Sequence, residues 1–371
     1  MRVLLLAAAS DIHSVRWANQ LSANGNEVHL CYMSNQKPAM DQFKNSVYLH
    51  ELKFGAPYGY YLNVLQLKRI IWGVKPDILN AHYSSGYGTL ARLTGFSPYL
   101  LSVYGSDVYD FPYRNKINMR IIKKNLLAAD GVASTSNVMA QQIKRLVDFP
   151  LENIFITPFG VDIDKFKKTD VDKNKDEFII GSIKKLSPKY GMKYGILAVD
   201  YLIKSLIKEN SITIKYYIYG EGEERENLFK LVKERQLEDV VEFKGRIPNN
   251  EVPRALNKFD VFLGNSILDS ESFGVAIVEA MACEVPVIVT DVDGFKEVVD
   301  GGKAGIMVPR KNSEIMAKEV YKLVKNPGLR KKIGMKQRDR VVKNYNWSDN
   351  VKKMESIYKI IFENQSLGRF Q

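Results

Sequence analysis

Two glutamates, Glu271 and Glu279, stand on either side of Gly274 in the stretch DSESFGVAIVEAMAC, with seven residues between them. Gly274 lies where a helix is predicted to begin, and it removes side-chain bulk where a ligand can approach backbone N–H groups. Those groups and the helix dipole favour a phosphate. A carboxylate beside an anion site is consistent only if it binds hydroxyl groups, for which it is a good acceptor. Phosphates and hydroxyls occur together in a sugar nucleotide, so we predict a site for one here.

The elements that must position this segment follow from the alternation of short apolar runs with amphipathic stretches. Buried strands are predicted at 3–8, 27–33, 78–81, 99–103, 131–134 and 153–157, then at 178–183, 212–219, 241–243, 261–263, 285–290 and 305–308. Helical patterns separate most of them, which is typical of parallel sheets with helices on both faces. Such sheets bind ligands beyond the carboxyl ends of their strands.

Two sets of predicted strands indicate two doubly wound α/β domains. The polar stretch KFKKTDVDKNKDE, residues 165–177, lacks a core pattern and separates the two sets. We therefore assign residues 1–164 to an N-terminal domain and residues 165–345 to a C-terminal domain. The last segment, 346–371, has a helical pattern that fits either a cap on the second domain or a return to the first.

Composition restricts the class of protein. The chain has 371 residues, of which 45% are hydrophobic and 26% charged, as in a folded globular protein rather than a disordered one. Two cysteines are too few for a disulfide scaffold, and no apolar run approaches the length of a membrane span. The net charge of +12 lies mostly in residues 303–371. It fits an anionic partner such as a nucleic acid, a lipid surface or a phosphorylated ligand, or else solvated helical faces.

Several motifs, in order, resemble the retaining glycosyltransferases of family 4. In the second half they are IGSIKKLSPKYGM, IYGEGEERENL, VEFKGRIPNNEVPRALNKFDVFL and ESFGVAIVEAMACEVPVIVTDVDG, which contains the E-x7-E spacing. In the first half they are SDIHSVRWANQLSANGNEVHL, LNAHYSSGYG, SVYGSDVYDFP and ITPFGVDIDKF. Two glutamates at this spacing are common on exposed helices, so the resemblance depends on the ordered set, which spans nearly the whole chain.

The resemblance implies a GT-B fold, in which two Rossmann-like domains face each other across a cleft and a C-terminal helix usually returns to the first domain. It implies retaining transfer of a hexose-type sugar from a UDP- or GDP-sugar to a saccharide or lipid-linked acceptor, without a metal or other cofactor, in bacterial capsule, exopolysaccharide or lipopolysaccharide synthesis. Retention without an obvious nucleophile favours a front-face displacement, in which the acceptor hydroxyl attacks from the side that the diphosphate leaves. We expect a cytoplasmic protein, peripheral on the inner face of the plasma membrane.

Site residues are carried over where the motifs match. Glu271 corresponds to the glutamate beside the donor sugar, Glu279 to the one that holds the ribose hydroxyls, and His82 to a histidine near the reacting sugars. We predict that Glu271 and His82 are catalytic. The predicted donor-binding set is Lys184, Lys189, Gly220, Arg246, Glu271, Ser272, Phe273, Gly274, Val275 and Glu279. The predicted acceptor-binding set is Ser10, His13, Gly105, Ser106 and Asp107.

The sequence departs from the family at the residues expected to bind the diphosphate. The family usually holds it with an arginine and a lysine, whereas here Lys184 stands at the arginine position and Tyr190 at the lysine position, with Lys189 before it. A lysine supplies a point charge without the two-pronged geometry of arginine. Alternatives for single residues stay open: a solvated loop for the lysines, a structural role for His82 and a turn cap for Asp107.

One pattern points to a different chemistry. Asp291 and Asp293 form a D-x-D, which can hold Mg²⁺ against a diphosphate. The same pattern recurs at 162–164 and 170–172, and the family match places 291–294 at a loop without a metal. The four histidines show no zinc-ligand spacing. We predict no metal site.

Other partners and functions fit parts of the sequence. Residues 114–124, RNKINMRIIKK, carry five basic residues and no acidic one, and fit either contact with anionic lipid headgroups or an ordinary surface helix. An enzyme of the same fold that hydrolyses or epimerises a nucleotide sugar would share the motifs. A basic nucleic-acid-binding protein would carry a recognised binding motif, and a dinucleotide oxidoreductase a glycine fingerprint after the first strand. The sequence contains neither, so we predict no nucleic-acid partner.

Overall fold

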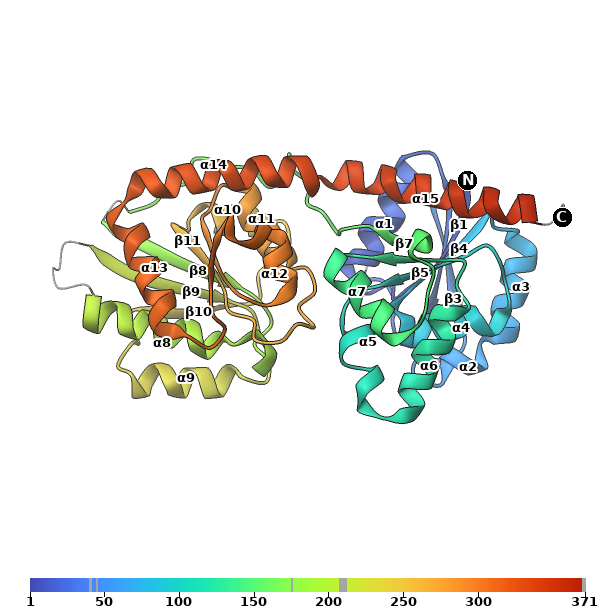
Figure 1. The fold of residues 1–371 in the computed structure, drawn as a ribbon, viewed down its shortest axis with the longest axis horizontal. Helices are drawn as coiled ribbons and strands as arrows, with labels where there is room; N and C mark the ends of the chain where they lie inside the picture. The colour runs from blue at the N-terminus through green and yellow to red at the C-terminus, as the bar shows by residue number, and fades with distance from the viewer. Residues whose placement is uncertain (40–41, 45, 175, 207–211, 369–371) are drawn as a thin grey trace. The chain divides into compact units, whose positions relative to one another are not determined.

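The chain divides into two compact units. The computed structural model describes residues 1–39, 42–44, 46–174, 176–206 and 212–368. Unit 1 contains residues 1–159 and the helical tail from Ser348, and unit 2 contains residues 160–347 (Figure 1). The boundary lies a few residues before 164, because Val161 already belongs to unit 2. Its backbone N–H donates to Tyr345 at 2.7 Å, and its carbonyl accepts from Trp347 at 2.9 Å.

Unit 1 is built on a seven-stranded parallel sheet in the order β3-β2-β1-β4-β5-β6-β7. The strands are β1 (Arg2–Leu6), β2 (Glu27–Met33), β3 (Val47–Leu52), β4 (Ile78–His82), β5 (Tyr99–Val103), β6 (Gly131–Ser134) and β7 (Ile154–Ile156). The central strands β4 and β5 are buried along their whole length, as strands covered by helices on both faces are. The edge strand β3 was not predicted, because several of its side chains are exposed and it lacks an apolar run.

Helices cover this sheet. They are α1 (Ile12–Ala23), α2 (Gly59–Leu62), α3 (Val64–Val74), α4 (Gly88–Thr94), α5 (Ser106–Tyr109), α6 (Lys116–Leu127) and α7 (Asn137–Leu146), with a π-helical turn at Tyr83–Tyr87. Asp11, Asn115 and Ser136 begin α1, α6 and α7 by accepting hydrogen bonds from first-turn N–H groups. α4 packs against α2, α3 and α6, so these four helices form one layer.

The C-terminal helix α15 (Trp347–Gly368) packs on unit 1 (Figure 1), which decides between the two positions that the sequence allowed. Glu355 accepts hydrogen bonds from Asn24 and Asn26 at 3.0 and 2.6 Å. The side chain of Tyr358 is buried. The predicted return of the C-terminal helix to the first domain is therefore confirmed.

Unit 2 has a six-stranded parallel sheet in the order β10-β9-β8-β11-β12-β13. The strands are β8 (Glu177–Ile183), β9 (Thr213–Tyr219), β10 (Val241–Gly245), β11 (Val261–Gly264), β12 (Val287–Thr290) and β13 (Ile306–Val308). The helices are α8 (Met192–Tyr201), α9 (Arg225–Glu234), α10 (Val252–Asn257), α11 (Val275–Ala282), α12 (Asp293–Val298), α13 (Ser313–Lys325) and α14 (Pro327–Asn344). α8 is followed by a π-helical turn, Leu202–Leu206, and residues 207–211 lie outside the described ranges.

Strand order reverses beside the first strand of each sheet. β1 lies between β2 and β4, and β8 lies between β9 and β11. Ligands of doubly wound sheets bind at the carboxyl edge at this point. The predicted architecture of two Rossmann-like domains is confirmed, and the residues that follow β4, β8 and β11 stand where a site is expected. Within the described ranges, no helix is long and apolar enough to cross a membrane.

Candidate active site

The central feature of unit 2 is an ion pair between Lys184 and Glu271. Lys184 follows β8 directly, and Glu271 lies between β11 and α11, so both partners come from the reversal point of the sheet. Nζ of Lys184 lies 2.6 Å from Oε2 of Glu271, and the two side chains are 26% and 10% exposed. Ser266 donates a hydrogen bond to the same oxygen at 3.4 Å. Two residues predicted separately, one for the diphosphate and one for the sugar, are thus in contact.

This contact sets the charge state of Lys184. Burial is the largest single influence on the pKa of Lys184 and acts to lower it. The charge and hydrogen bond of Glu271, together with Tyr190 and Glu279, outweigh burial, and the pKa is raised. Lys184 is therefore a cation at physiological pH, as a ligand of a diphosphate must be. Glu279 is half-buried on α11 and near enough to act on Lys184.

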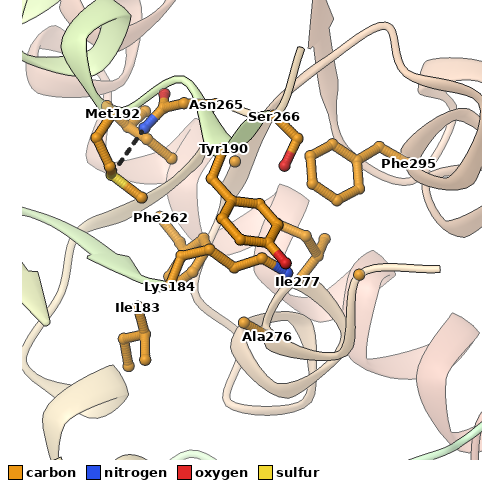
Figure 2. Close-up of a pocket in the computed structure, with 13 residues that line it drawn as sticks. Ile183, Lys184, Tyr190, Met192, Phe262, Asn265, Ser266, Ala276, Ile277 and Phe295 are labelled. Atoms are coloured by element: carbon orange, nitrogen blue, oxygen red, sulfur yellow. Dashed lines mark hydrogen bonds between the residues drawn. The ribbon is translucent and has the colours of Figure 1, made fainter. Parts of the chain in front are cut away.

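Tyr190 contacts two cations, although it was not among the predicted site residues. Nζ of Lys184 and Nζ of Lys189 lie 4.5 and 4.9 Å from the centre of its ring. Figure 2 shows Lys184 running along this ring. An ammonium group at such a distance is attracted to an aromatic ring. The tyrosine at the family's lysine position thus orients two lysines instead of supplying a charge, and the departure itself was the signal that could have found it.

A small cavity of about 20 Å³ borders Lys184 (Figure 2). It is lined by the ends of β8 and β11, by Gly274 and Ile277 at the start of α11, and by Phe295 of α12. On its wall, Asn265 donates a hydrogen bond to the sulfur of Met192 at 3.7 Å. A cavity of this size has room for about one water molecule and is too small to hold a sugar.

Gly274 precedes α11 in a left-handed conformation. Its φ is +84°, and an added Cβ atom would lie 2.5 Å from the ring of Phe295. The first N–H groups of a helix have no partners within that helix, and Val275 begins this one. Ser272 and Phe273 are buried, and the Phe273 ring packs edge-on against Tyr345 at 5.4 Å. The predicted segment 272–275 therefore offers a ligand mainly its backbone.

Gly274→Ala is expected to destabilise the protein by about 3 kcal/mol, of which about 1 comes from the left-handed φ and the rest from overpacking. The matched control is Gly301→Ala, since Gly301 has φ +62° but open space around an added Cβ atom. That variant is expected to lose only about 1 kcal/mol. Denaturant unfolding measures both values. Equal losses would show that the contact with Phe295 has no effect.

Gly220 and Arg246 differ in their relation to the ion pair. Gly220 follows β9 with φ +140°, and an added Cβ atom would overlap the carbonyl oxygen of Lys184. Glycine is required there so that the chain can pass the backbone of Lys184. Arg246 is exposed after the edge strand β10, which β9 separates from β8. The structure thus places Gly220 at Lys184 and leaves Arg246 at the edge of the sheet.

Arg310 is a positioning residue that the sequence analysis missed. It follows β13, and its guanidinium group donates to Asp269 at 3.0 Å, to Asp291 at 3.1 Å and to the carbonyl oxygen of Ile267 at 3.4 Å. Burial acts to raise the pKa of Asp269, but hydrogen bonds from Arg310 and from the N–H of Asp293, with the charges of Arg310 and Lys296, together outweigh burial, and the pKa is lowered. Arg310 therefore fixes the loop that leads to Glu271. Its place directly after a predicted strand was the available signal.

The D-x-D carboxylates have cationic partners of their own. Asp291 accepts hydrogen bonds from Arg310, and Asp293 forms an ion pair with Lys296 at 3.3 Å. In the part of the chain that the structure describes, no group of three or more His, Cys, Asp or Glu side chains is arranged to hold a metal ion.

In unit 1, His82 ends β4 within a buried hydrogen-bond network. The amide group of Asn80 donates to the carbonyl of Leu100 at 3.1 Å and to Ser102 at 2.9 Å, so its Oδ1 atom is left as an acceptor. That oxygen accepts from Tyr358 on α15 at 3.3 Å and lies 3.1 Å from Nε2 of His82. A neutral His82 therefore carries its proton on Nε2. Among the described residues, its buried Nδ1 atom has no hydrogen-bond partner.

This environment predicts a pH dependence of stability. Burial, with a smaller contribution from His13, lowers the pKa of His82 to about 3. Between this value and the ordinary pKa of about 6.5, the unfolded chain binds a proton that the folded protein excludes. The stabilisation is therefore complete above about pH 6.5 and falls by about 2 kcal/mol at pH 5. We expect His82→Asn to remove this loss, as measured by urea unfolding at both pH values. An unchanged pH dependence in the variant would contradict the burial of a neutral imidazole.

Asp107, predicted to bind the acceptor or to cap a turn, is held by backbone N–H groups. Its Oδ2 accepts from the backbone N–H of Ser84 at 2.7 Å, and its Oδ1 accepts from those of Tyr104 and Gly105 at 3.1 and 2.9 Å. The side chain is buried, and burial raises the pKa of Asp107 although these hydrogen bonds oppose it. Asp107 therefore caps the loop after β5, which is the alternative that the sequence left open. Ser106 is the exposed residue of this motif.

Aromatic rings connect the predicted residues at the carboxyl edge of unit 1. His13, in the first turn of α1, stacks on Phe159 at 4.1 Å, and Phe159 stacks on Tyr104 at 5.0 Å. Tyr104 meets the ring of His82 edge-on at 5.3 Å. His13 and His82 are thus joined by two rings that the sequence analysis did not select. Ser10 is exposed in the loop before them.

Comparisons with known proteins agree with this geometry. A family model described as "Glycosyl transferase 4-like" matches residues 2–136, and one described as "Glycosyl transferases group 1" matches residues 163–340. WcaL from Escherichia coli (strain K12), provisionally named a colanic acid biosynthesis glycosyltransferase, is 34% identical over 52% of this chain. That match spans 47% of WcaL, about half the length of this relative.

Two further proteins are similar over nearly the whole chain. N-acetyl-alpha-D-glucosaminyl L-malate synthase from Bacillus anthracis is 24% identical over 97% of this chain and 96% of its own. The crystal structure of Anabaena Alr3699/HepE in complex with UDP and glucose has a TM-score of 0.76 at 16% identity, and covers 96% of this chain and 98% of that one. The two family models lie in order on the two Rossmann-like units. The chain therefore belongs to the group 1 glycosyl transferases, the family 4 type with a GT-B fold.

Proposed function

We propose that the protein transfers a hexose-type sugar, with retention of configuration, from a UDP- or GDP-sugar to a saccharide or lipid-linked acceptor. The observation that carries the proposal is the contact of Lys184 with Glu271 at the carboxyl edge of unit 2, close to Gly274 before α11. A cation and a helix start suit a diphosphate, and a carboxylate suits sugar hydroxyls. The three groups match the parts of a nucleotide sugar.

The reaction requires stabilisation of the negative charge that develops on the departing diphosphate. Lys184, Lys189 and the N–H groups at the start of α11 supply it. In a front-face displacement the acceptor oxygen bonds to the anomeric carbon as the bond from that carbon to the diphosphate breaks, and the leaving phosphate takes the hydroxyl proton. Glu271 orients the sugar and opposes the positive charge that develops at the anomeric carbon.

A metal-independent reaction is part of this proposal. The engagement of Asp291 by Arg310 and of Asp293 by Lys296 supports it, because both D-x-D carboxylates already have cationic partners. Lys184 provides positive charge where a metal would otherwise face the diphosphate.

The names of similar proteins support the same substrate class. The Bacillus anthracis protein is named for an N-acetylglucosaminyl group, WcaL for colanic acid biosynthesis, and the Anabaena crystal holds UDP and glucose. By analogy we propose a role in bacterial polysaccharide synthesis, in the cytoplasm and at a membrane that carries the acceptor.

The proposal is tested by a thermal-shift panel of nucleotide sugars followed by product analysis. A matched donor should raise Tm by several degrees, because it binds only the folded protein. Proton NMR of the product should show the anomeric configuration of the donor, with rates unchanged by EDTA. An inverted product would refute retention, and loss of activity in EDTA would refute metal independence. Release of free sugar at the same rate without acceptor would identify a hydrolase instead.

A further inference from the structure

The outer side of α2 and α3 exposes large apolar side chains. Tyr58, Tyr61, Leu62, Leu65 and Trp72 are 76%, 52%, 57%, 70% and 80% exposed. On α3, Leu65 and Trp72 lie on a different face from the one that packs on the core. On the core face Leu67 is buried, and Val64, Ile70 and Ile71 are partly buried. The helix therefore has an apolar stripe on each side, and packing within unit 1 accounts for only one of them.

Trp72 makes the outer stripe unusual. The other two tryptophans of the chain, Trp17 and Trp347, are buried. A tryptophan with most of its surface in water has no structural use where it stands. Single exposed apolar residues are common, but five large ones on two consecutive helices mark a surface that binds something.

The charged residues around this stripe indicate the kind of partner that it binds. Residues 53–75 contain four basic residues and no acidic one. Lys68 and Arg69 lie between Leu65 and Trp72 on the same outer face, and both are exposed. Trp and Tyr concentrate at the interface between water and lipid, and Lys and Arg beside them are attracted to anionic headgroups. A protein partner would need an apolar surface of its own, with acidic residues placed against two adjacent cations.

We propose that the outer surface of residues 53–75, the α2–α3 patch, binds a bilayer that contains anionic lipids. The patch adjoins the carboxyl edge of unit 1, because Tyr60 of α2 packs edge-on against Tyr87 at 5.4 Å, in the turn that follows His82. Membrane contact there would hold a lipid-linked acceptor near His82. This last point rests on the proposed function, whereas lipid binding by the patch does not.

The segment singled out in the sequence, 114–124, is the weaker candidate. It forms most of α6, where Ile122 is buried and Ile121 partly buried, so these side chains serve the core. Only Ile117 is fully outward, at 68% exposure. The helix α4 packs between α3 and α6, which places both segments in the same layer of unit 1.

The test uses the full chain and vesicles of phosphatidylcholine, with and without phosphatidylglycerol. Co-sedimentation should show binding to the anionic vesicles, and Trp72 fluorescence should shift to shorter wavelength as the ring leaves water. Leu65→Ser with Trp72→Ser, and separately Lys68→Gln with Arg69→Gln, should each weaken binding about tenfold or more. The matched control is Met335→Ser, because Met335 is 52% exposed on the strongly basic helix α14 and should have no effect.

Three results would overturn the proposal. Vesicle binding could survive both double variants, or Met335→Ser could weaken vesicle binding as much as they do. The protein could also form a dimer without lipid that dissociates in the Leu65→Ser, Trp72→Ser variant, as measured by sedimentation velocity. The last would identify the patch as a protein interface. Sugar transfer to a water-soluble acceptor should be unchanged in both double variants. If vesicles bind but no nucleotide sugar does, the proposed function fails and the α2–α3 patch stands.

Discussion

Lys184→Met is expected to lower kcat by about a hundredfold to a thousandfold, the effect of removing one preorganised group that faces developing charge. The Nζ atom of Lys184 is held by Glu271 at 2.6 Å and by the ring of Tyr190, so it is in place before the reaction begins. Charge on the leaving diphosphate grows as the bond breaks, so the loss should fall mainly on kcat and less on KM. Initial rates at saturating donor measure it.

The control is the next residue in the chain. Lys185 has the same charge, is 66% exposed, and has only a distant ion pair with Glu223 at 3.9 Å. Lys185→Met should stay within about twofold of the unaltered protein, because an exposed charge contributes little. Equal losses in the two variants would mean that the lysines act as a diffuse positive loop, and the assigned role of Lys184 would be wrong.

The same substitution has a separate effect on folding. Without Lys184, the buried carboxylate of Glu271 loses its cation, which we expect to cost about 2 kcal/mol, less than for a fully buried pair because Lys184 keeps some solvent contact. Adding Glu271→Gln to Lys184→Met should restore most of the stability and none of the activity. The double variant therefore separates loss of fold from loss of chemistry.

The fold could be predicted from the sequence where burial is complete. β4 and β5 are covered on both faces, so most of their residues are apolar, whereas most side chains of the edge strand β3 are not buried and this strand was missed. Periodicity alone could not predict which unit α15 covers, because its buried face looks the same in either place, and the expected return came from the family resemblance. The hydrogen bonds of Glu355 with Asn24 and Asn26 show that α15 covers unit 1, and these contacts exist only in the folded structure.

The site was predictable residue by residue but not as an arrangement. Lys184 and Glu271 were found from separate motifs, and their contact depends on β8 lying next to β11. Arg310 was missed because its role depends on two aspartates that precede it in the chain and meet it only in the fold. The sequence could not decide between acceptor binding and a turn cap for Asp107, because it does not show which way a loop carboxylate points. The turn at Gly105, with φ +126°, closes the backbone around the carboxylate of Asp107.

Glu271→Gln is expected to lower kcat by about a hundredfold while KM for the donor changes little. Glutamine keeps the shape and one acceptor oxygen for a sugar hydroxyl, but it removes the charge that opposes the positive anomeric carbon of the transition state. The pH profile should move as well. Glu271 holds the pKa of Lys184 up against burial, so in the variant that pKa falls and the alkaline loss of activity begins at lower pH.

Glu279→Gln distinguishes this role from simple binding of the substrate. Glu279 is predicted to hold ribose hydroxyls, which remain the same in the ground state and the transition state, so its loss should raise KM for the donor and leave kcat nearly unchanged. Rates measured over a range of donor concentrations and pH separate the two patterns. If Glu271→Gln also raised only KM, without moving the alkaline limb, then Glu271 would bind the donor without assisting the transfer. The sugar would have to be activated by other groups, and the contact with Lys184 would be a structural one.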